Sequence, residues 1–167
     1  MICLLLKITG AVLIIFASFS VGCMRSKKLY HRRDFLNRLS VFMSTLSTYL
    51  RYNSSDIFTM IRLSADSSCL SELSVQKSDK PFEELWNTSV EMIPKSVSLT
   101  KQDYELLAEI GFQLGKTDIE GQLKHLELCG ERLKMQISDA ENCISNKSKL
   151  YKTMGFFVGA SAAILLL

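Results

Sequence analysis

The sequence predicts an all-α protein, an antiparallel bundle of about five or six helices with an apolar, membrane-spanning helix at each end. Apolar residues recur at steps of three and four along several segments, which is the period of a helix that buries one face. No segment alternates apolar and polar residues as a half-buried strand does. Both chain ends are apolar runs flanked by Lys and Arg. We therefore expect membrane helices at 1–24 and 153–167, and a helical domain with basic flanks at 25–152.

The N-terminal apolar run carries a single charge, Lys7, and is long enough for the roughly 20 residues that a bilayer core requires. Lys and Arg tend to stay on the cytoplasmic side, so the basic residues that follow the run favour an uncleaved anchor with its N-terminus outside. A cleaved signal peptide and a lipoprotein attached at Cys23 are alternatives, but both would carry these charges across the membrane. The residues expected at the membrane surface here are Arg25, Lys27, Lys28, Arg32 and Arg33.

Two helices are expected after this basic flank. An amphipathic pattern with a wide apolar face runs from 34 to 52 and is predicted to continue the anchor helix. A polar cluster marks a turn, and a short helix follows at 57–65. The serine-rich stretch 66–80 is predicted to be a loop with one helical turn around Leu70 and Leu73.

The next two helices are marked by residues that begin or end helices. Pro81 stands in the first turn of one helix, and Pro94 ends it. Thr100 caps the following helix with Asp103 three residues further on. Gly115 is then expected to stop that helix, as glycine does just past a helix end.

The last third of the chain, Thr117 to Leu167, is predicted to be one long helix that opens with the capping-box pattern of Thr117 and Glu120. A gap of one residue, Lys116, separates it from the preceding helix, which favours antiparallel packing inside the same chain. Its partner is expected to be the apolar face at 35–50. The seam follows the a/d pattern of helices that pack lengthwise, at Ile119, Leu123, Leu126, Gly130, Leu133, Ile137, Ala140 and Ile144.

The end of this helix is uncharged from Met154 onward and is short for a full membrane span. Small residues at Gly155 and Gly159 would let it pack closely against the N-terminal anchor. We therefore expect a membrane hairpin with both termini outside. Its basic residues at the cytoplasmic surface are Lys147, Lys149 and Lys152.

The charge distribution separates an acidic body from basic flanks. Between Asp34 and Asn146 there are 11 Lys and Arg against all 17 Asp and Glu, a net charge of about −6. The cationic residues lie beside the apolar ends, where anionic headgroups would meet them. Nucleic acid is therefore not an expected partner.

The sequence offers no constellation for catalysis. It contains no phosphate-binding loop, no nucleophile elbow and no metalloprotease helix. His125 and Cys129 share a helix face, but a zinc site needs further ligands, and the pattern supplies none. The five cysteines form no C-x-x-C pair and indicate no disulfide framework. We expect no enzyme activity, no cofactor and no metal.

Several features together resemble the stage III sporulation protein AB family of endospore-forming bacteria. An N-terminal anchor is followed by basic residues, and the end pattern Lys-x-Tyr-Lys-x-Met-Gly-Phe-x-x-Gly occupies 149–159. The phrase L-G-x-x-D-x-x-x-Q-x-x-H-L begins at Leu114, and its polar and glycine positions are Gly115, Asp118, Gln122 and His125. These four residues are candidates for contact with a partner, and the alternative is that they only shape the helix junction.

The resemblance implies a function in the channel that links mother cell and forespore. The cytoplasmic domain would be similar to the platform domains of the type II secretion F protein. Its expected partners are a hexameric ATPase of the stage III sporulation protein AA type, other channel proteins and the lipid bilayer. The expected location is the mother-cell membrane around the forespore, with the domain in the cytoplasm. A membrane-tethered scaffold that is not coupled to an ATPase is the alternative.

Overall fold

All the regular secondary structure in the part of the chain that the structure describes is helical. The computed structural model describes residues 2–52 and 55–166, with side chains throughout 23–52 and 55–146 and at a few positions nearer the ends. None of these residues lies in a β-strand. The all-α prediction is therefore confirmed. The α-helices are α1 (Ile2–Tyr52), α2 (Ile57–Ser68), α3 (Phe82–Glu91), α4 (Lys101–Gln113) and α5 (Ile119–Leu166), with 3-10 turns at Ser71–Leu73 and Lys95–Val97.

The chain divides into two compact units. The bundle unit is Arg32–Asp139, and the terminal unit combines Met1–His31 with Ala140–Leu167. The predicted domain boundaries at 24 and 152 stay a prediction. Among the described residues, no helix contains a stretch that is both long and apolar enough to cross a membrane. The membrane helices predicted at 1–24 and 153–167 depend on side chains most of which lie outside the described set.

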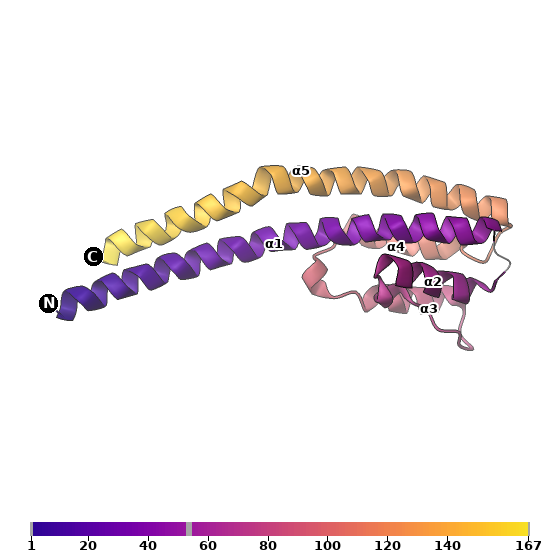
Figure 1. Ribbon diagram of the computed structural model, residues 1–167, viewed down its shortest axis with the longest axis horizontal. Helices are drawn as coiled ribbons and strands as arrows, with labels where there is room; N and C mark the ends of the chain where they lie inside the picture. Colours follow the sequence, from indigo (N-terminus) through magenta and orange to yellow (C-terminus); the bar gives the residue numbers. More distant parts are fainter. Residues whose placement is uncertain (1, 53–54, 167) are drawn as a thin grey trace. The chain divides into compact units, whose positions relative to one another are not determined.

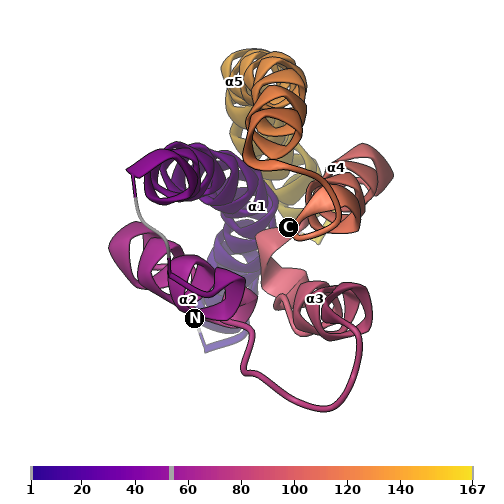
Figure 2. The ribbon, with the colours of Figure 1, turned by 90° about the vertical axis from the view of Figure 1, so that its right-hand side faces the viewer.

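In the bundle unit, α2, α3 and α4 lie alongside the second half of α1 and the first half of α5 (Figure 1). Seen end-on, the five helices follow one another around a common core in chain order (Figure 2). Helix α1 supplies an apolar stripe at steps of three and four, as its sequence pattern predicts. The members of that stripe are all buried: Phe35, Leu36, Leu39, Phe42, Met43, Leu46 and Leu50.

Trp86 on α3 is at the centre of this core and is fully buried. Its ring centroid lies 6.0 Å from that of Phe42 on α1 and 6.1 Å from that of Phe82. Its indole Nε1 donates a hydrogen bond of 2.7 Å to the carbonyl oxygen of Leu107 on α4. The close approach of α4 depends on Gly111, because a Cβ at that position would lie 2.0 Å from Trp86 Cδ1. A single aromatic side chain thus joins three helices.

Most of the predicted helix boundaries are confirmed. Thr100 and Asp103 form a reciprocal capping box at the start of α4. Gly115 has a φ of 78°, the left-handed conformation that glycine adopts after a helix. Pro81 is the N-cap residue of α3 rather than a residue of its first turn, and α3 ends at Glu91, ahead of Pro94.

The predicted start of the long helix was wrong. The helix begins at Ile119 rather than Thr117, and Leu114 to Asp118 form a connection longer than one residue. The predicted seam is confirmed in part, because Leu126, Leu133 and Ala140 are buried while Ile119 is 55% exposed. Gln122 lies outside the seam and is 7% exposed, and it forms two hydrogen bonds in the connection. The buried residues of α5 are Gln122, Leu126, Cys129, Leu133 and Ala140.

Candidate functional site at the junction of α4 and α5

Gly115 and Asp118 of the sequence motif lie in the connection between α4 and α5, and Gln122 and His125 lie in the first turns of α5. Gly115 allows the chain to leave α4 in a left-handed conformation, and nothing lies within 4 Å of where its Cβ would be. Its requirement for glycine is therefore one of backbone conformation, not of space. The backbone N–H of Lys116 donates to the carbonyl oxygen of Gln113 at 3.2 Å, which closes the turn.

Gln122 closes the junction from the side of α5. Its Oε1 accepts a hydrogen bond from the backbone N–H of Gly115 at 3.2 Å, and its Nε2 donates to the carbonyl oxygen of Thr117 at 2.7 Å. One buried amide therefore satisfies a donor and an acceptor that the irregular backbone leaves unpaired. The sequence indicated only a polar position beside the seam, because the partners of Gln122 are backbone atoms of a turn.

Asp118 caps α5. Its Oδ1 accepts from the backbone N–H of Gly121 at 3.2 Å, and its carbonyl oxygen accepts from the N–H of Gln122 at 3.0 Å. An aspartate at this position pairs a helix N–H that would otherwise lack a partner and places a negative charge at the positive end of the helix dipole. Asp118 is the residue that performs the capping expected of Thr117.

His125 joins α5 to α4 one turn further along. Its Nε2 lies 2.8 Å from the carbonyl oxygen of Glu109 and 3.5 Å from the Sγ of Cys129. A carbonyl oxygen only accepts, so Nε2 carries the proton and donates it. The Glu109 carboxylate pairs with Arg132 on α5. Burial, together with the negative charge of Glu109, raises the pKa of Cys129 to about 11, so its thiol is neutral at physiological pH.

Charged groups surround the junction. Lys116 pairs with Glu83 of α3 at 2.6 Å, and its Nζ lies 4.0 Å from the ring centroid of Phe112. Asp118 and Glu120 are both exposed. The junction therefore has hydrogen bonds that hold it in place and an acidic surface at the start of α5.

A groove of about 960 Å³ begins beside Ile119 and Glu120 and lies between α5 and α1. Leu123 and Gly130 of the predicted seam line the α5 side, and serines line much of the α1 side. The first five positions of the predicted seam, from Ile119 to Leu133, therefore line this groove. The lining serines are Ser40, Ser44 and Ser47.

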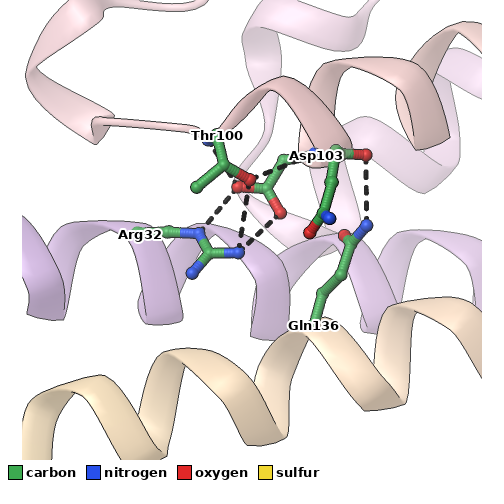
Figure 3. A network of polar contacts seen from close by, with 5 residues as sticks. Arg32, Thr100, Asp103 and Gln136 are labelled. Atoms are coloured by element: carbon green, nitrogen blue, oxygen red, sulfur yellow. Dashed lines mark hydrogen bonds and ion pairs between the residues drawn. The ribbon is translucent and has the colours of Figure 1, made fainter.

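A second polar cluster ties α1 to the start of α4 (Figure 3). Arg32 contacts Asp103 twice, with Nε 2.7 Å from Oδ2 and Nη2 2.9 Å from Oδ1. The side chain of Arg32 is 11% exposed and that of Asp103 is 0% exposed. Nearby, Gln136 on α5 donates from Nε2 to the carbonyl oxygen of Gln102 at 3.1 Å. The cluster thus gives the start of α4 polar contacts to both long helices.

The electrostatics of this cluster favour the ionised carboxylate. Burial on its own raises the pKa of Asp103, but the hydrogen bonds from Arg32 and Thr100 outweigh it and hold the pKa below its usual 3.8. Sequence reasoning missed this pair and assigned Arg32 to the membrane surface. The only signal for Asp103 was its place in the capping box, and nothing in the sequence connects it with a residue so far away.

The other residues predicted to lie at the membrane surface divide into three groups. Arg25, Lys27 and Lys28 are exposed in the terminal unit. Arg33 is half-buried and pairs with the adjacent Asp34 at 2.7 Å. The side chains of the lysines before the C-terminal apolar run lie outside the described residues: Lys147, Lys149 and Lys152.

The fold and the junction define an all-α protein in which a helical bundle carries two long helices toward the chain ends. The chain belongs to the stage III sporulation protein AB family, whose model matches residues 7–167. It is 28% identical over 171 residues to stage III sporulation protein AB of Bacillus subtilis (strain 168), covering 98% of this chain and 100% of that relative. No solved structure matches it. The chain is therefore a sporulation protein, as the resemblance of its motifs predicts.

Proposed function

We propose that this chain is a non-catalytic membrane platform component of the mother cell–forespore channel, and that it couples a cytoplasmic ATPase to that channel. The observation that carries the proposal is membership of the stage III sporulation protein AB family over residues 7–167. The family gives a role in sporulation, and the platform and the ATPase are our inference from the helical bundle and from the resemblance to type II secretion F domains.

The proposed location is the mother-cell membrane, with the bundle unit in the cytoplasm. Support comes from the sequence, where the apolar ends are flanked by basic residues. Helices α1 and α5 also extend from the bundle unit into the terminal unit without a break.

The proposed docking site for the ATPase is the acidic start of α5 together with the adjoining groove. Asp118 and Glu120 are exposed there, and Ile119 between them is 55% exposed although it is a large apolar residue. A partner's apolar side chain could bury Ile119 together with the apolar lining of the adjoining groove, and the two acids would then lie at the rim of the contact. We place the partner here because hydrogen bonds from Asp118 and Gln122 hold the junction in one conformation, and a surface that is already ordered loses little entropy when it binds.

The test is the affinity of the full chain in detergent for a stage III sporulation protein AA-like ATPase from the same organism. Reversing the charge of Asp118 would also remove the α5 cap, so the informative variant is Asp118→Asn with Glu120→Gln, which keeps a capping oxygen and removes both charges. Two exposed ion pairs contribute about 1 kcal/mol, so we expect binding to weaken roughly fivefold and to depend less on salt.

The matched control replaces two exposed acids of the serine-rich segment, Asp66→Asn with Asp79→Asn, and should bind as the unaltered chain does. Equal binding by both double variants would contradict docking at the junction. If the unaltered chain does not bind the ATPase at all, the membrane-tethered scaffold is the better description and the coupling proposal fails.

A further inference from the structure

Helices α4 and α5 bring together three side chains of types that bind metals. His125 and Cys129 are one turn apart on α5, and Glu109 faces them from α4. One ligand atom from each of the three lies within 4.8 Å of the other two. The sequence offered only the His125 and Cys129 pair, and antiparallel packing of α4 against α5 supplies the third ligand.

The separation of the nitrogen and sulfur atoms is suited to zinc. A tetrahedral zinc ion with sulfur at about 2.3 Å and nitrogen at about 2.0 Å holds those two atoms about 3.5 Å apart. The Sγ of Cys129 and the Nε2 of His125 are 3.5 Å apart. A carboxylate oxygen of Glu109 would complete three protein ligands by approaching at most about 1.5 Å closer. Glu109 is only half-buried, so its side chain has room for this movement.

We propose that Glu109, His125 and Cys129 form a zinc site that fastens α4 to α5, with a water molecule as the fourth ligand. Sulfur and imidazole donors favour Zn²⁺ over Mg²⁺ and Ca²⁺, which prefer oxygen ligands alone. Three protein ligands and a water molecule are a usual zinc coordination. The proposal concerns the stability of the bundle and is independent of the membrane topology and of the ATPase.

Binding changes the protons and hydrogen bonds of the site in a defined way. The Cys129 thiol releases its proton to solvent and binds as thiolate. The His125 ring moves its proton from Nε2 to Nδ1 and stays neutral, so it gives up its hydrogen bond to the Glu109 carbonyl oxygen. Arg132, which pairs with the Glu109 carboxylate, can keep one carboxylate oxygen while the other binds the metal.

The experiment uses the full chain in detergent, stripped of metal and titrated with Zn²⁺ alone in competition with a chromophoric chelator. Co²⁺ serves as the spectroscopic probe, because a thiolate ligand gives it a charge-transfer absorption and tetrahedral geometry gives it strong visible bands. We expect one equivalent of either ion to bind and the melting temperature to rise with zinc.

Cys129→Ser should abolish the charge-transfer absorption and weaken zinc binding at least tenfold. Glu109→Gln, a milder change at a half-buried position, should weaken zinc binding and keep the charge-transfer absorption. The matched control is Cys143→Ser. Cys143 is a half-buried cysteine on the same helix and lies two heptads beyond Cys129. It should bind as the unaltered chain does.

The melting temperature of each variant without metal shows whether it is folded. If Cys129→Ser is unfolded, the zinc affinity of Glu109→Gln and the cobalt spectrum of the unaltered chain still test whether the zinc site exists. No binding by the unaltered chain, cobalt bands without charge transfer, or zinc affinity unchanged in both variants would each overturn the site. In that case the three side chains form a hydrogen-bonded contact between α4 and α5 and nothing more.

Discussion

Several polar side chains of the bundle unit pair with groups at helix ends. Gln122 pairs with two backbone groups of the α4–α5 connection, and Asp103 pairs with Thr100 and Arg32 at the start of α4. The capping role of Asp103 was predictable because its partner is three residues away. The ion pair with Arg32 was not, since a contact over 71 residues leaves no trace in one sequence.

Replacing Asp103 with Asn tests that buried ion pair. An asparagine can still accept from the Thr100 backbone, but it leaves the guanidinium of Arg32 largely buried without a counter-charge. Removing one partner of such a pair costs about 3–5 kcal/mol, so the free energy of unfolding at pH 7 should fall by that amount. Chemical denaturation of the full chain in detergent would measure it.

The effect should depend on pH with a definite sign. The folded pKa of Asp103 is lowered, so its contribution to stability is complete above the unfolded value of 3.8 and is lost as pH falls through the folded pKa. The difference in free energy of unfolding between the unaltered chain and Asp103→Asn should therefore become smaller from pH 5 toward pH 2. A difference that stays constant over this range would contradict a charge-based role. The control Asp79→Asn, at an exposed position, should have almost the same free energy of unfolding as the unaltered chain throughout this pH range.

At the scale of the helices, the patterns predicted the helical segments and most of the face that each long helix buries. In α1 the apolar stripe is clear on one side, and it is the buried side. In α5 the apolar heptad positions and the buried Gln122 lie on neighbouring stripes. Periodicity predicted the buried Leu126, Leu133 and Ala140, whereas the burial of Gln122 comes from its contacts in the α4–α5 connection.

Two glycine substitutions on helices should change stability in opposite directions. Gly111→Ala places a Cβ 2.0 Å from Trp86 Cδ1, and Trp86 cannot move easily because it is fully buried and bonded to Leu107. Overpacking of this kind costs about 1–3 kcal/mol, which exceeds the gain of about 1 kcal/mol in helix propensity. The melting temperature should fall.

Gly130→Ala is the control on α5, where nothing lies within 4 Å of the added Cβ. Here only the propensity term acts, and stability should rise by about 0.5–1 kcal/mol. Equal shifts of the melting temperature for the two variants would contradict the close approach of α4 to Trp86. The need for glycine at 111 was not readable from the sequence, because it depends on a side chain of another helix.

At the scale of the whole molecule, most of the predictions made from the sequence came from the distribution of charged and apolar residues. The acidic segment and the basic flanks were evident from counts alone, and the helical class followed from the period of the apolar residues. The division into a bundle unit and a terminal unit falls inside α1 and α5, at His31 and Ala140. No proline or glycine in the sequence marks those two positions, and both helices continue through them.

The proposed hairpin topology can be tested with reporter fusions in sporulating cells. A fluorescent reporter that folds only in the cytoplasm should be active when inserted after Lys77, in an exposed stretch of the bundle unit. It should be inactive at either terminus, where an exported phosphatase should be active instead. Insertion at Val75 would be less informative, because that residue is 4% exposed and contributes to the core.

The physical reason for this orientation is the set of basic residues that follows the N-terminal apolar run. Replacing Arg25, Lys27 and Lys28 with Gln removes three exposed positive charges that resist translocation. Part of the population should then insert in the opposite sense, with reporter activity appearing on both sides. Arg32 is left unchanged in this variant, since its loss would unpair Asp103 and confound orientation with folding. If the cytoplasmic reporter is active when fused to the C-terminus of the unaltered chain, the hairpin is ruled out, whatever the result for the glutamine variant.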